Sequence, residues 1–250
     1  MTLLRRIALA TLAAPLALGL AACNSGTEAD GGLSGEPVAE VAPPEGKTWS
    51  DVVTVTDMGG YAVGNPNAPI KLIEYGSLTC PGCAAFSAQA SVPLHEKYIN
   101  SGRVNFEFRS FIIHGPLDLV LTRLIGCSSP EAAVPLADQI WANLGPIQQR
   151  AYQDQGAMEA ALALPEDQRF VAFAQATGVY DFFAARGISA DQAKTCLADF
   201  ASLEKLANLS QRYANEENIT KTPTFVLNGQ IIDESSWDQV EAALQRAGAR

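Results

Sequence analysis

The sequence is short of positive charge, of histidine and of long unbroken apolar runs. Its 250 residues hold 17 lysines and arginines against 27 aspartates and glutamates, which gives a formal net charge of −10. Proteins that bind nucleic acids need basic surface against phosphates, so this balance argues against that class. Two histidines and a single Cys-x-x-Cys pair are too few for an ordinary zinc site. We therefore expect no metal, no other cofactor and no nucleic-acid partner.

The N-terminus has the features of an export signal. Two arginines precede an apolar run at 7–20 that a proline and a glycine interrupt, and the run is too short to cross a bilayer comfortably. The following Leu20-Ala21-Ala22-Cys23 resembles the lipobox of bacterial lipoproteins, which implies cleavage before Cys23 and a lipid anchor on that residue. An ordinary secretory signal with an incidental cysteine is the alternative. We interpret residues 1–22 as a lipoprotein signal peptide.

The next segment, 23–50, is predicted to be a lipid-anchored flexible linker. It is rich in Gly, Ser, Glu, Pro and Ala and shows no apolar periodicity. Such a segment buries too little apolar surface to offset the entropy lost on ordering. It would tether the folded part to the membrane through the lipid on Cys23.

Strand-like and helical patterns in the remaining chain predict one domain interrupted by another. Apolar runs of strand length at 70–75 and 104–109 flank a helical stretch that begins at the Cys-x-x-Cys pair, as in a βαβ unit with parallel strands. A helical region follows, and then a hairpin around an Asn-Gly turn and a final helix. The prediction is a two-segment domain, 51–113 and 216–250, with a helical insertion at 114–215.

Cys80 and Cys83 enclose Pro-Gly at the predicted junction of a strand and a helix. Free backbone N–H groups and the helix dipole stabilise an anion there, which lowers the pKa of a thiol. Since the thiolate is the attacking species in disulfide exchange, we expect Cys80, at an exposed helix edge, to be the nucleophile. Cys83, one turn inward, would resolve the mixed disulfide. A purely structural disulfide is the weaker alternative, because so short a loop constrains the chain little.

These motifs together resemble the DsbA-like thiol–disulfide oxidoreductases. The resemblance rests on Ser77-Leu78-Thr79-Cys80-Pro81-Gly82-Cys83, on the helical insertion and on Lys221-Thr222-Pro223-Thr224-Phe225, and it spans about residues 50–250. It implies an α/β, thioredoxin-like fold with an inserted α-helical subdomain. It also implies an enzyme that exchanges disulfides with exported cysteine-containing proteins and is recycled by a redox partner in the membrane.

The resemblance assigns roles to three further residues. Pro223 matches a cis-proline that faces the cysteine pair, and Thr222 before it would contact the substrate or the Cys80 sulfur. Glu74 matches a buried acid near Cys83, where burial would raise its pKa and let it relay protons. The alternatives are a trans proline at a strand start and a carboxylate on the surface.

Cys127 and Cys196 both fall in the predicted helical insertion. An exported compartment permits disulfides, so we expect them to form a second, non-catalytic bridge that closes the helical subdomain. Two buried free thiols are the alternative, because the geometry that decides pairing is not in the sequence.

Gly82 leaves the direction of the reaction open. The strongest oxidants of the family have histidine there, which stabilises the thiolate of the first cysteine, and glycine cannot. The leading hypothesis is a lipid-anchored dithiol oxidase at the periplasmic face of a bacterial membrane. The alternatives are a disulfide reductase or isomerase for a specific partner, and a peptide-binding chaperone module that would not need the cysteines.

Overall fold

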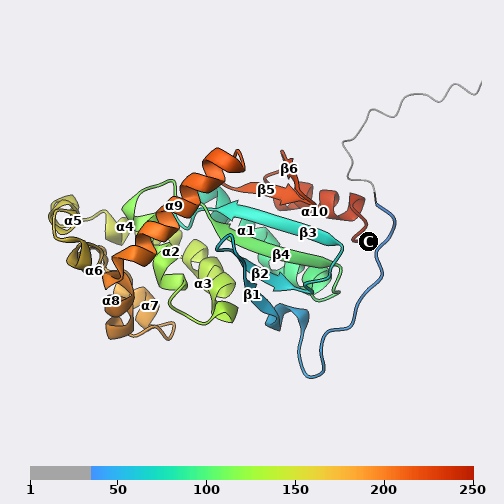
Figure 1. Ribbon diagram of the computed structural model, residues 1–250, viewed down its shortest axis with the longest axis horizontal. Coiled ribbons are helices and arrows are strands. Elements are labelled where there is room, and N and C mark those ends of the chain that lie inside the picture. Colours follow the sequence, from blue (N-terminus) through green and yellow to red (C-terminus); the bar gives the residue numbers. More distant parts are fainter. Residues whose placement is uncertain (1–34) are drawn as a thin grey trace, which may run out of the picture. The chain divides into compact units, whose positions relative to one another are not determined.

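The computed structural model describes residues 35–250, so the predicted signal peptide and Cys23 lie outside the described residues. A six-stranded sheet with the order β1-β2-β4-β3-β5-β6 forms its centre (Figure 1). The strands are β1 (Val53–Val55), β2 (Tyr61–Gly64), β3 (Ile70–Gly76), β4 (Val104–Ser110), β5 (Thr224–Leu227) and β6 (Gln230–Ile232). The central pair β3–β4 is parallel, as the βαβ pattern predicts, and the other pairs are antiparallel.

Among the described residues, one short helix precedes the sheet, and the others follow the cysteine pair, fill the insertion and end the chain. They are η1 (Trp49–Asp51), α1 (Pro81–Pro93), η2 (Leu94–Ile99), α2 (Pro116–Ile125), α3 (Pro130–Ala142), α4 (Leu144–Ala151), α5 (Gln155–Leu162), α6 (Glu166–Thr177), α7 (Val179–Ala184), α8 (Ala190–Ala198), α9 (Phe200–Glu216) and α10 (Trp237–Arg246). No helix in the described part of the chain is both long and apolar enough to span a membrane.

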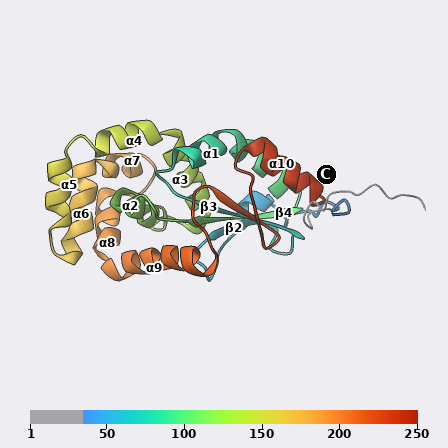
Figure 2. The same ribbon diagram turned by 90° about the horizontal axis from the view of Figure 1, so that it is seen from above.

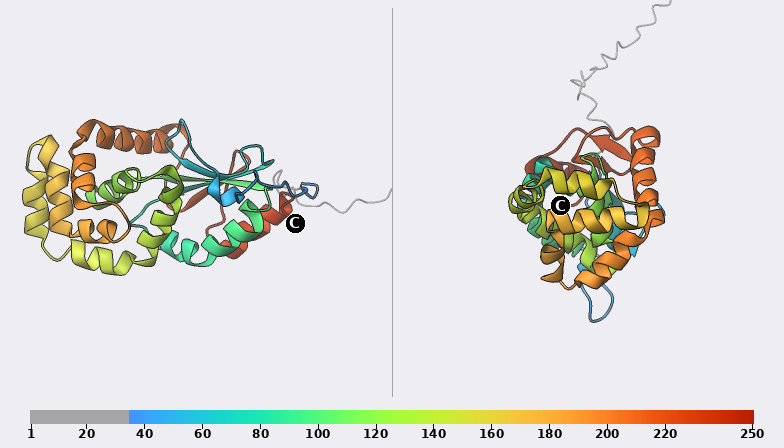
Figure 3. Two further views of the ribbon diagram at one scale, coloured as in Figure 1. Left: turned by 90° about the horizontal axis from the view of Figure 1, so that it is seen from below. Right: turned by 90° about the vertical axis from the view of Figure 1, so that its left-hand side faces the viewer.

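The helices divide between the two faces and one end of the sheet. α1 and α10 cover one face, and α9 lies on the other (Figure 2). The helices α4 to α8 gather beyond the end of the sheet at which β3 finishes (Figure 3). Aromatic contacts join the layers. The ring centroid of Phe86 in α1 lies 4.5 Å from that of Phe225 in β5 and 6.2 Å from that of Trp237 in α10. The insertion therefore sits next to the point where the chain leaves β3.

Part of the predicted linker is bound to the sheet domain. The backbone N–H of Gly35 donates to the carbonyl of Arg246 over 2.8 Å, and that of Val38 donates to Gly248 over 2.9 Å. This differs from the flexible tether expected for 23–50. The ordering comes from backbone pairing with the end of the chain, which leaves no pattern in composition or periodicity.

Candidate active site

Cys80 and Cys83 lie where β3 gives way to α1. Cys80 is the N-cap residue of α1, and Cys83 is in its first turn, behind Pro81 at the first helical position. A proline is well placed there, because the N–H that it lacks has no partner within the helix. Both cysteines are free thiols. Cys83 is fully buried and Cys80 is only 6% exposed, so the expectation of an exposed Cys80 is wrong.

The loop before β5 covers Cys80. The Thr222–Pro223 peptide bond is cis, and the Cys80 thiol donates to the carbonyl oxygen of Thr222 over 3.4 Å. β5 pairs with β3, so this loop lies beside the end of β3 that leads into the cysteine pair. A Cβ on Gly82 would lie 3.2 Å from Cδ of Pro223, tighter than most such contacts. The glycine therefore lets the proline approach the pair closely.

The two thiols have opposite electrostatic environments. A hydrogen bond from Cys83 lowers the pKa of Cys80 to about 5, helped by Thr222 and by the backbone N–H groups of Gly82 and Cys83, and opposed by burial. Burial raises the pKa of Cys83 well above its ordinary value, and the sulfur of Cys80 and the charge of Glu74 add to the effect. At neutral pH Cys80 is therefore a thiolate and Cys83 a neutral thiol.

Glu74 lies on β3 inside the sheet, opposite Phe108 of β4 and Phe225 of β5. It is 2% exposed, and its Oε1 atom has no hydrogen-bond partner among residues 35–250. Burial raises the pKa of Glu74 well above its ordinary value, with further contributions from the charges of Asp138 and Cys80. A neutral carboxyl group that can give up a proton is therefore coupled electrostatically to both cysteines.

Asp118, at the start of α2, holds the loop before the cysteines and was missed by the sequence analysis. Its carboxylate accepts hydrogen bonds from the Ser77 hydroxyl over 2.7 Å and from the Leu78 backbone N–H over 3.0 Å. Burial raises the pKa of Asp118 to about 6, against the lowering effect of these two donors. His114 approaches the same serine, with Nδ1 2.9 Å from Oγ. The sequence feature that could have indicated Asp118 is an acidic residue among the apolar residues of a helix, between Leu117 and Val120.

Two more side chains of the insertion bind the same loop. Nε1 of Trp141 in α3 donates to the carbonyl of Ser77 over 3.0 Å, and Nε2 of Gln148 in α4 donates to that of Thr79, also over 3.0 Å. Sequence reasoning did not find these residues, because neither carries a motif. The helical insertion thus fixes the backbone that leads into Cys80.

A groove runs beside the pair, between α1, the cis-proline loop and the start of α10. It is lined by Gly82, Ala85, Phe86, Gln89, Lys221, Thr222, Pro223, Ser235 and Ser236. The only charged residue in this lining, Lys221, forms an ion pair with Asp233, with Nζ 3.1 Å from Oδ1. The groove is therefore a largely uncharged surface next to Cys80.

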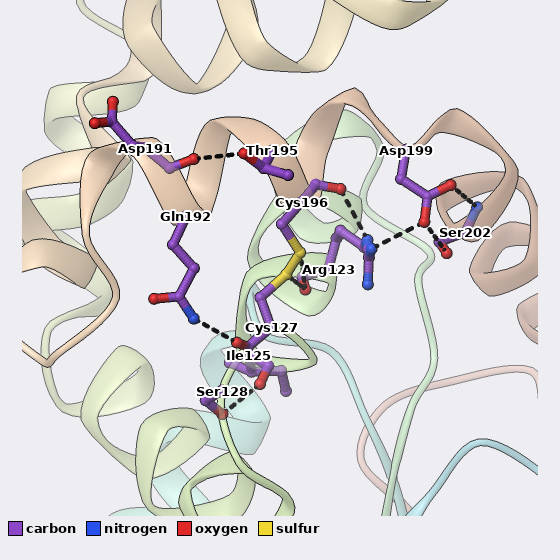
Figure 4. Close-up of a disulfide and its surroundings, with 10 residues drawn as sticks. All are labelled: Arg123, Ile125, Cys127, Ser128, Asp191, Gln192, Thr195, Cys196, Asp199 and Ser202. Carbon is purple, nitrogen blue, oxygen red and sulfur yellow. Dashed lines mark hydrogen bonds and ion pairs between the residues drawn. A yellow bond between two sulfur atoms is a disulfide. The ribbon is translucent and has the colours of Figure 1, made fainter.

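Cys127 and Cys196 form a disulfide that joins the turn after α2 to α8 (Figure 4). Arg123 lies against it, with Nε donating to the carbonyl of Cys196 over 3.2 Å and the guanidinium paired with Asp199 at 3.2 Å. Nε2 of Gln192 donates to the Cys127 carbonyl over 2.9 Å. The bridge is wholly within the insertion and contributes no sulfur to the surroundings of Cys80.

The arrangement can exchange disulfides, and it offers little to a metal. Within the described range, no three His, Cys, Asp or Glu side chains are grouped so as to hold a metal ion. A thiolate, a buried partner thiol and a protonated acid are instead the groups needed to form and resolve a mixed disulfide.

Comparison with known proteins supports this interpretation. The family model described as "Thioredoxin" matches residues 56–246. A curated relative from Rickettsia bellii, "Putative protein-disulfide oxidoreductase", is 24% identical over 82% of this chain and 70% of its own length. "Disulfide bond formation protein D" of Bacillus subtilis is 22% identical over 75% of this chain and 77% of its own.

Solved structures agree with these relatives. A structure titled as a protein-disulfide isomerase from Novosphingobium aromaticivorans superposes with a TM-score of 0.69 at 25% identity, covering 75% of this chain and 96% of that one. Alpha-DsbA1 of Wolbachia pipientis gives a TM-score of 0.60 at 20% identity, over 75% of this chain and 89% of its own. The predicted α/β, thioredoxin-like fold with a helical insertion is confirmed. The chain belongs to the thioredoxin family and is a DsbA-like thiol–disulfide oxidoreductase.

Proposed function

We propose that this protein is an extracytoplasmic dithiol oxidase that donates the disulfide of Cys80 and Cys83 to exported proteins. The observation that carries the proposal is the position of Cys80, which caps the start of α1 beside the Cys83 thiol and the cis Thr222–Pro223 bond. In this position the Cys83 thiol and the start of α1 lower the pKa of Cys80 to about 5. A stabilised thiolate favours the reduced pair, so the oxidised pair gives up its disulfide more readily. Oxidase action therefore does not require a histidine in place of Gly82.

The expected reduction potential follows from the thiol acidity. The attacking cysteine has a pKa of about 7 in thioredoxin and about 3.5 in DsbA, and the two proteins have potentials of about −270 mV and about −120 mV. Cys80, with a pKa of about 5, falls between them. We expect a potential in that interval, above the value for thioredoxin.

The reaction balances as an exchange of one disulfide for another. A substrate thiolate forms a bond with Sγ of oxidised Cys80, the bond between Cys80 and Cys83 breaks, and Cys83 leaves and takes up a proton. The second substrate thiolate then attacks the substrate sulfur of the mixed disulfide and expels the Cys80 thiolate. The substrate loses two electrons, and the protein gains them as a thiolate and a thiol.

Pro223, Thr222 and Glu74 complete this site in the proposal. The groove beside Gly82 would receive an extended substrate segment, with the backbone around the cis bond as its docking edge. Glu74 would supply the proton for Cys83, because burial keeps the carboxyl group protonated. The disulfide of the insertion, Cys127–Cys196, would be structural.

The proposed setting rests on the sequence. The signal at 1–22 and the lipobox cysteine support export and a lipid anchor on Cys23, at the periplasmic face of a bacterial membrane. A redox protein of that membrane would reoxidise the pair. We also propose the division into 51–113 plus 216–250 as the redox domain and 114–215 as the insertion. Mass spectrometry of the mature N-terminus tests the anchor, since an unmodified Cys23 or a different first residue would contradict it.

The reduction potential of the Cys80–Cys83 pair tests the direction of the reaction. The protein is equilibrated with glutathione buffers of graded ratio, and its thiols are trapped and counted by mass. A potential above about −200 mV supports a disulfide donor, and one near about −270 mV would instead identify a reductase. The Cys83→Ser variant, which cannot close the internal disulfide, controls for adducts with glutathione.

The Cys80→Ser variant distinguishes the oxidase from the alternative of a peptide-binding chaperone module. An oxidase loses its ability to oxidise a reduced substrate protein completely in this variant, because the nucleophilic sulfur is gone. A peptide-binding module would suppress aggregation of an unfolded chain equally well with and without the sulfur. If Cys80→Ser still oxidised the reduced substrate protein, the oxidase proposal would be overturned.

A further inference from the structure

A small cavity joins the buried acid of the redox site to the helical insertion. Glu74 of β3, Ser87 of α1 and Asp138 of α3 line it, and most of the remaining wall is aromatic or aliphatic. Its volume is about 20 Å³. A space of this size holds about one water molecule when polar groups are there to bind it. The cavity thus gives Glu74 a route toward α3.

One carboxyl oxygen of Glu74 needs a hydrogen-bond partner that residues 35–250 do not supply. Its Oε1 atom is buried and accepts no hydrogen bond from any residue in the described part of the chain. An unsatisfied buried oxygen costs about 1–3 kcal/mol, so such groups in native proteins are normally bound to protein or to ordered water. A water in the cavity would satisfy this oxygen and lie between Glu74 and the polar side chains of Ser87 and Asp138 in the same wall.

Asp138 is the more exposed of the two acids. It is half-buried, whereas Glu74 is 2% exposed, and its Oδ1 accepts a hydrogen bond of 2.6 Å from the Ser87 hydroxyl. Burial raises the pKa of Asp138 to about 6, partly offset by that serine. The charge of Asp138 also contributes to the raised pKa of Glu74, so the two carboxyl groups sense each other.

The remaining titratable groups around the cavity are few. His95 of η2 lines it, and burial lowers the pKa of this imidazole while its Nδ1 lies 2.9 Å from the Ser50 hydroxyl. No lysine or arginine is among the residues that line it. The charge of Cys80 helps to raise the pKa of Glu74, and the charge of Glu74 helps to raise that of Cys83. Asp138 is therefore the group best placed to pass protons between Glu74 and solvent.

We propose that Asp138, held by Ser87, is the outer positioning residue of a proton path that runs from solvent through the cavity to Glu74 and Cys83. The inference rests on the proposed exchange at Cys80 and Cys83. When the bond between the two sulfurs breaks, Cys83 leaves as a thiolate and takes a proton from Glu74. The cavity water carries a proton from Asp138 to Glu74, and solvent reprotonates Asp138. Electrons move only between sulfurs.

The test is the pH profile of the exchange rate in Asp138→Asn. The oxidised protein is mixed with excess dithiol peptide between about pH 5 and about pH 8, and the loss of its internal disulfide is followed after acid quenching. The amide keeps the shape and accepts the Ser87 hydroxyl, but it cannot exchange a proton. We expect a rate about 10-fold lower near neutral pH and the loss of the inflection that Asp138 gives near its own pKa, after correction for the peptide thiol.

Three variants make the result specific. Ser87→Ala removes only the hydroxyl that holds Asp138, and we expect it to shift the inflection. His95→Gln removes the other titratable side chain near Asp138 in the cavity wall and should leave the pH profile of the exchange rate unchanged. Glu159→Gln makes the same carboxyl-to-amide change at an exposed site on α5 and should also match the wild type.

The outcomes separate the path from the proposed function. A wild-type profile in Asp138→Asn, with ordinary exchange by the wild-type protein, would overturn the path alone. Loss of the inflection in His95→Gln instead would move the exit to the histidine and overturn the role of Asp138. If Cys80→Ser, which has no internal disulfide, oxidises the dithiol peptide as fast as the oxidised wild-type protein does, the proposed oxidase function fails first. Should Asp138→Asn not fold, Ser87→Ala decides, because an unchanged profile there contradicts the proposal.

Discussion

The sulfur of Cys80 faces two different groups of Thr222. Its thiol donates to the carbonyl oxygen of Thr222 over 3.4 Å, while the Thr222 hydroxyl is buried and makes no hydrogen bond within residues 35–250. The carbonyl suits the protonated sulfur, since it can only accept. The hydroxyl can donate to the thiolate, and Thr222 accordingly lowers the pKa of Cys80. One residue thus has a partner atom for each protonation state.

Thr222→Val tests this arrangement. The valine keeps the shape but removes the only donor of this side chain, so the thiolate has no hydroxyl from which to accept a charge-assisted hydrogen bond. We expect the pKa of Cys80 to rise from about 5 by about one unit. The ultraviolet absorbance of the thiolate, titrated in the reduced protein, measures it. Thr222→Ser retains a donor and should stay near the wild type, and equal values in both variants would refute the role of the hydroxyl.

The stability of the reduced protein should depend on pH through Cys80. Its pKa is lowered from 9.0 to about 5 in the folded protein, so the folded state binds this proton more weakly than the unfolded chain. The resulting stabilisation is complete above about pH 9 and is lost as the pH falls through about 5. We expect the urea midpoint of the reduced form to exceed that of the oxidised form at neutral pH, and the difference to shrink on acidification.

The control for that experiment is Cys80→Ser. This variant has no titrating sulfur at the start of α1, so the pH dependence assigned to Cys80 should be absent from its stability. The raised pKa values of Glu74 and Asp138 act in both redox forms and largely cancel from the difference. A difference between the redox forms that does not change with pH would contradict the assignment.

Asp118 should matter for stability more than its single carboxylate suggests. Asp118→Ala leaves the buried Leu78 N–H and the Ser77 hydroxyl without this acceptor, so we expect a loss of about 1–3 kcal/mol in the free energy of unfolding. Asp118→Asn keeps an acceptor for Leu78 and should cost less. Because burial raises the pKa of Asp118 to about 6, its charge is unfavourable above that pH, and the penalty is relieved as the pH falls through about 6. Urea denaturation of the variants checks both expectations.

Removal of the second disulfide should weaken the protein without changing its redox chemistry. The bridge between Cys127 and Cys196 spans 69 residues, and replacing both cysteines by alanine should cost about 2–4 kcal/mol. We expect the reduction potential of Cys80–Cys83 to stay the same, because the bridge lies wholly within the insertion. A calorimetric scan and the glutathione equilibrium measure the two effects. A shifted potential would show that the insertion controls the redox pair.

The sequence predicted those parts of the molecule that depend on local patterns. The junction of β3 and α1 at Cys80 follows from an apolar run, a proline at the first helical position and a cysteine spacing, all within a short stretch. β2 escaped notice because it is four residues long and ends in a glycine, and only pairing with β1 and β4 makes it a strand.

The contacts that complete the site come from distant parts of the chain. Cys80 is covered by Thr222, 142 residues away, which is why its burial was not foreseen. Gln148 reaches Thr79 across 69 residues, and Asp118 reaches Leu78 across 40. The first contact depends on the pairing of β5 with β3, and the other two depend on how the insertion docks on the sheet domain. No local periodicity encodes either.

The segment at 35–41 is bound to the sheet domain at the end of the central strands that is farther from the cysteine pair. The backbone N–H of Val41 donates to the carbonyl of Ser101, just before the start of β4, and that of Gly35 donates to the carbonyl of Arg246 near the end of the chain. Because β3 and β4 run parallel, these contacts lie at the edge where both strands begin, and Cys80 follows the edge where β3 ends. The first described residues and the cysteine pair therefore lie at opposite ends of the central strands, so the segment at 35–41 leaves the surface around Cys80 uncovered.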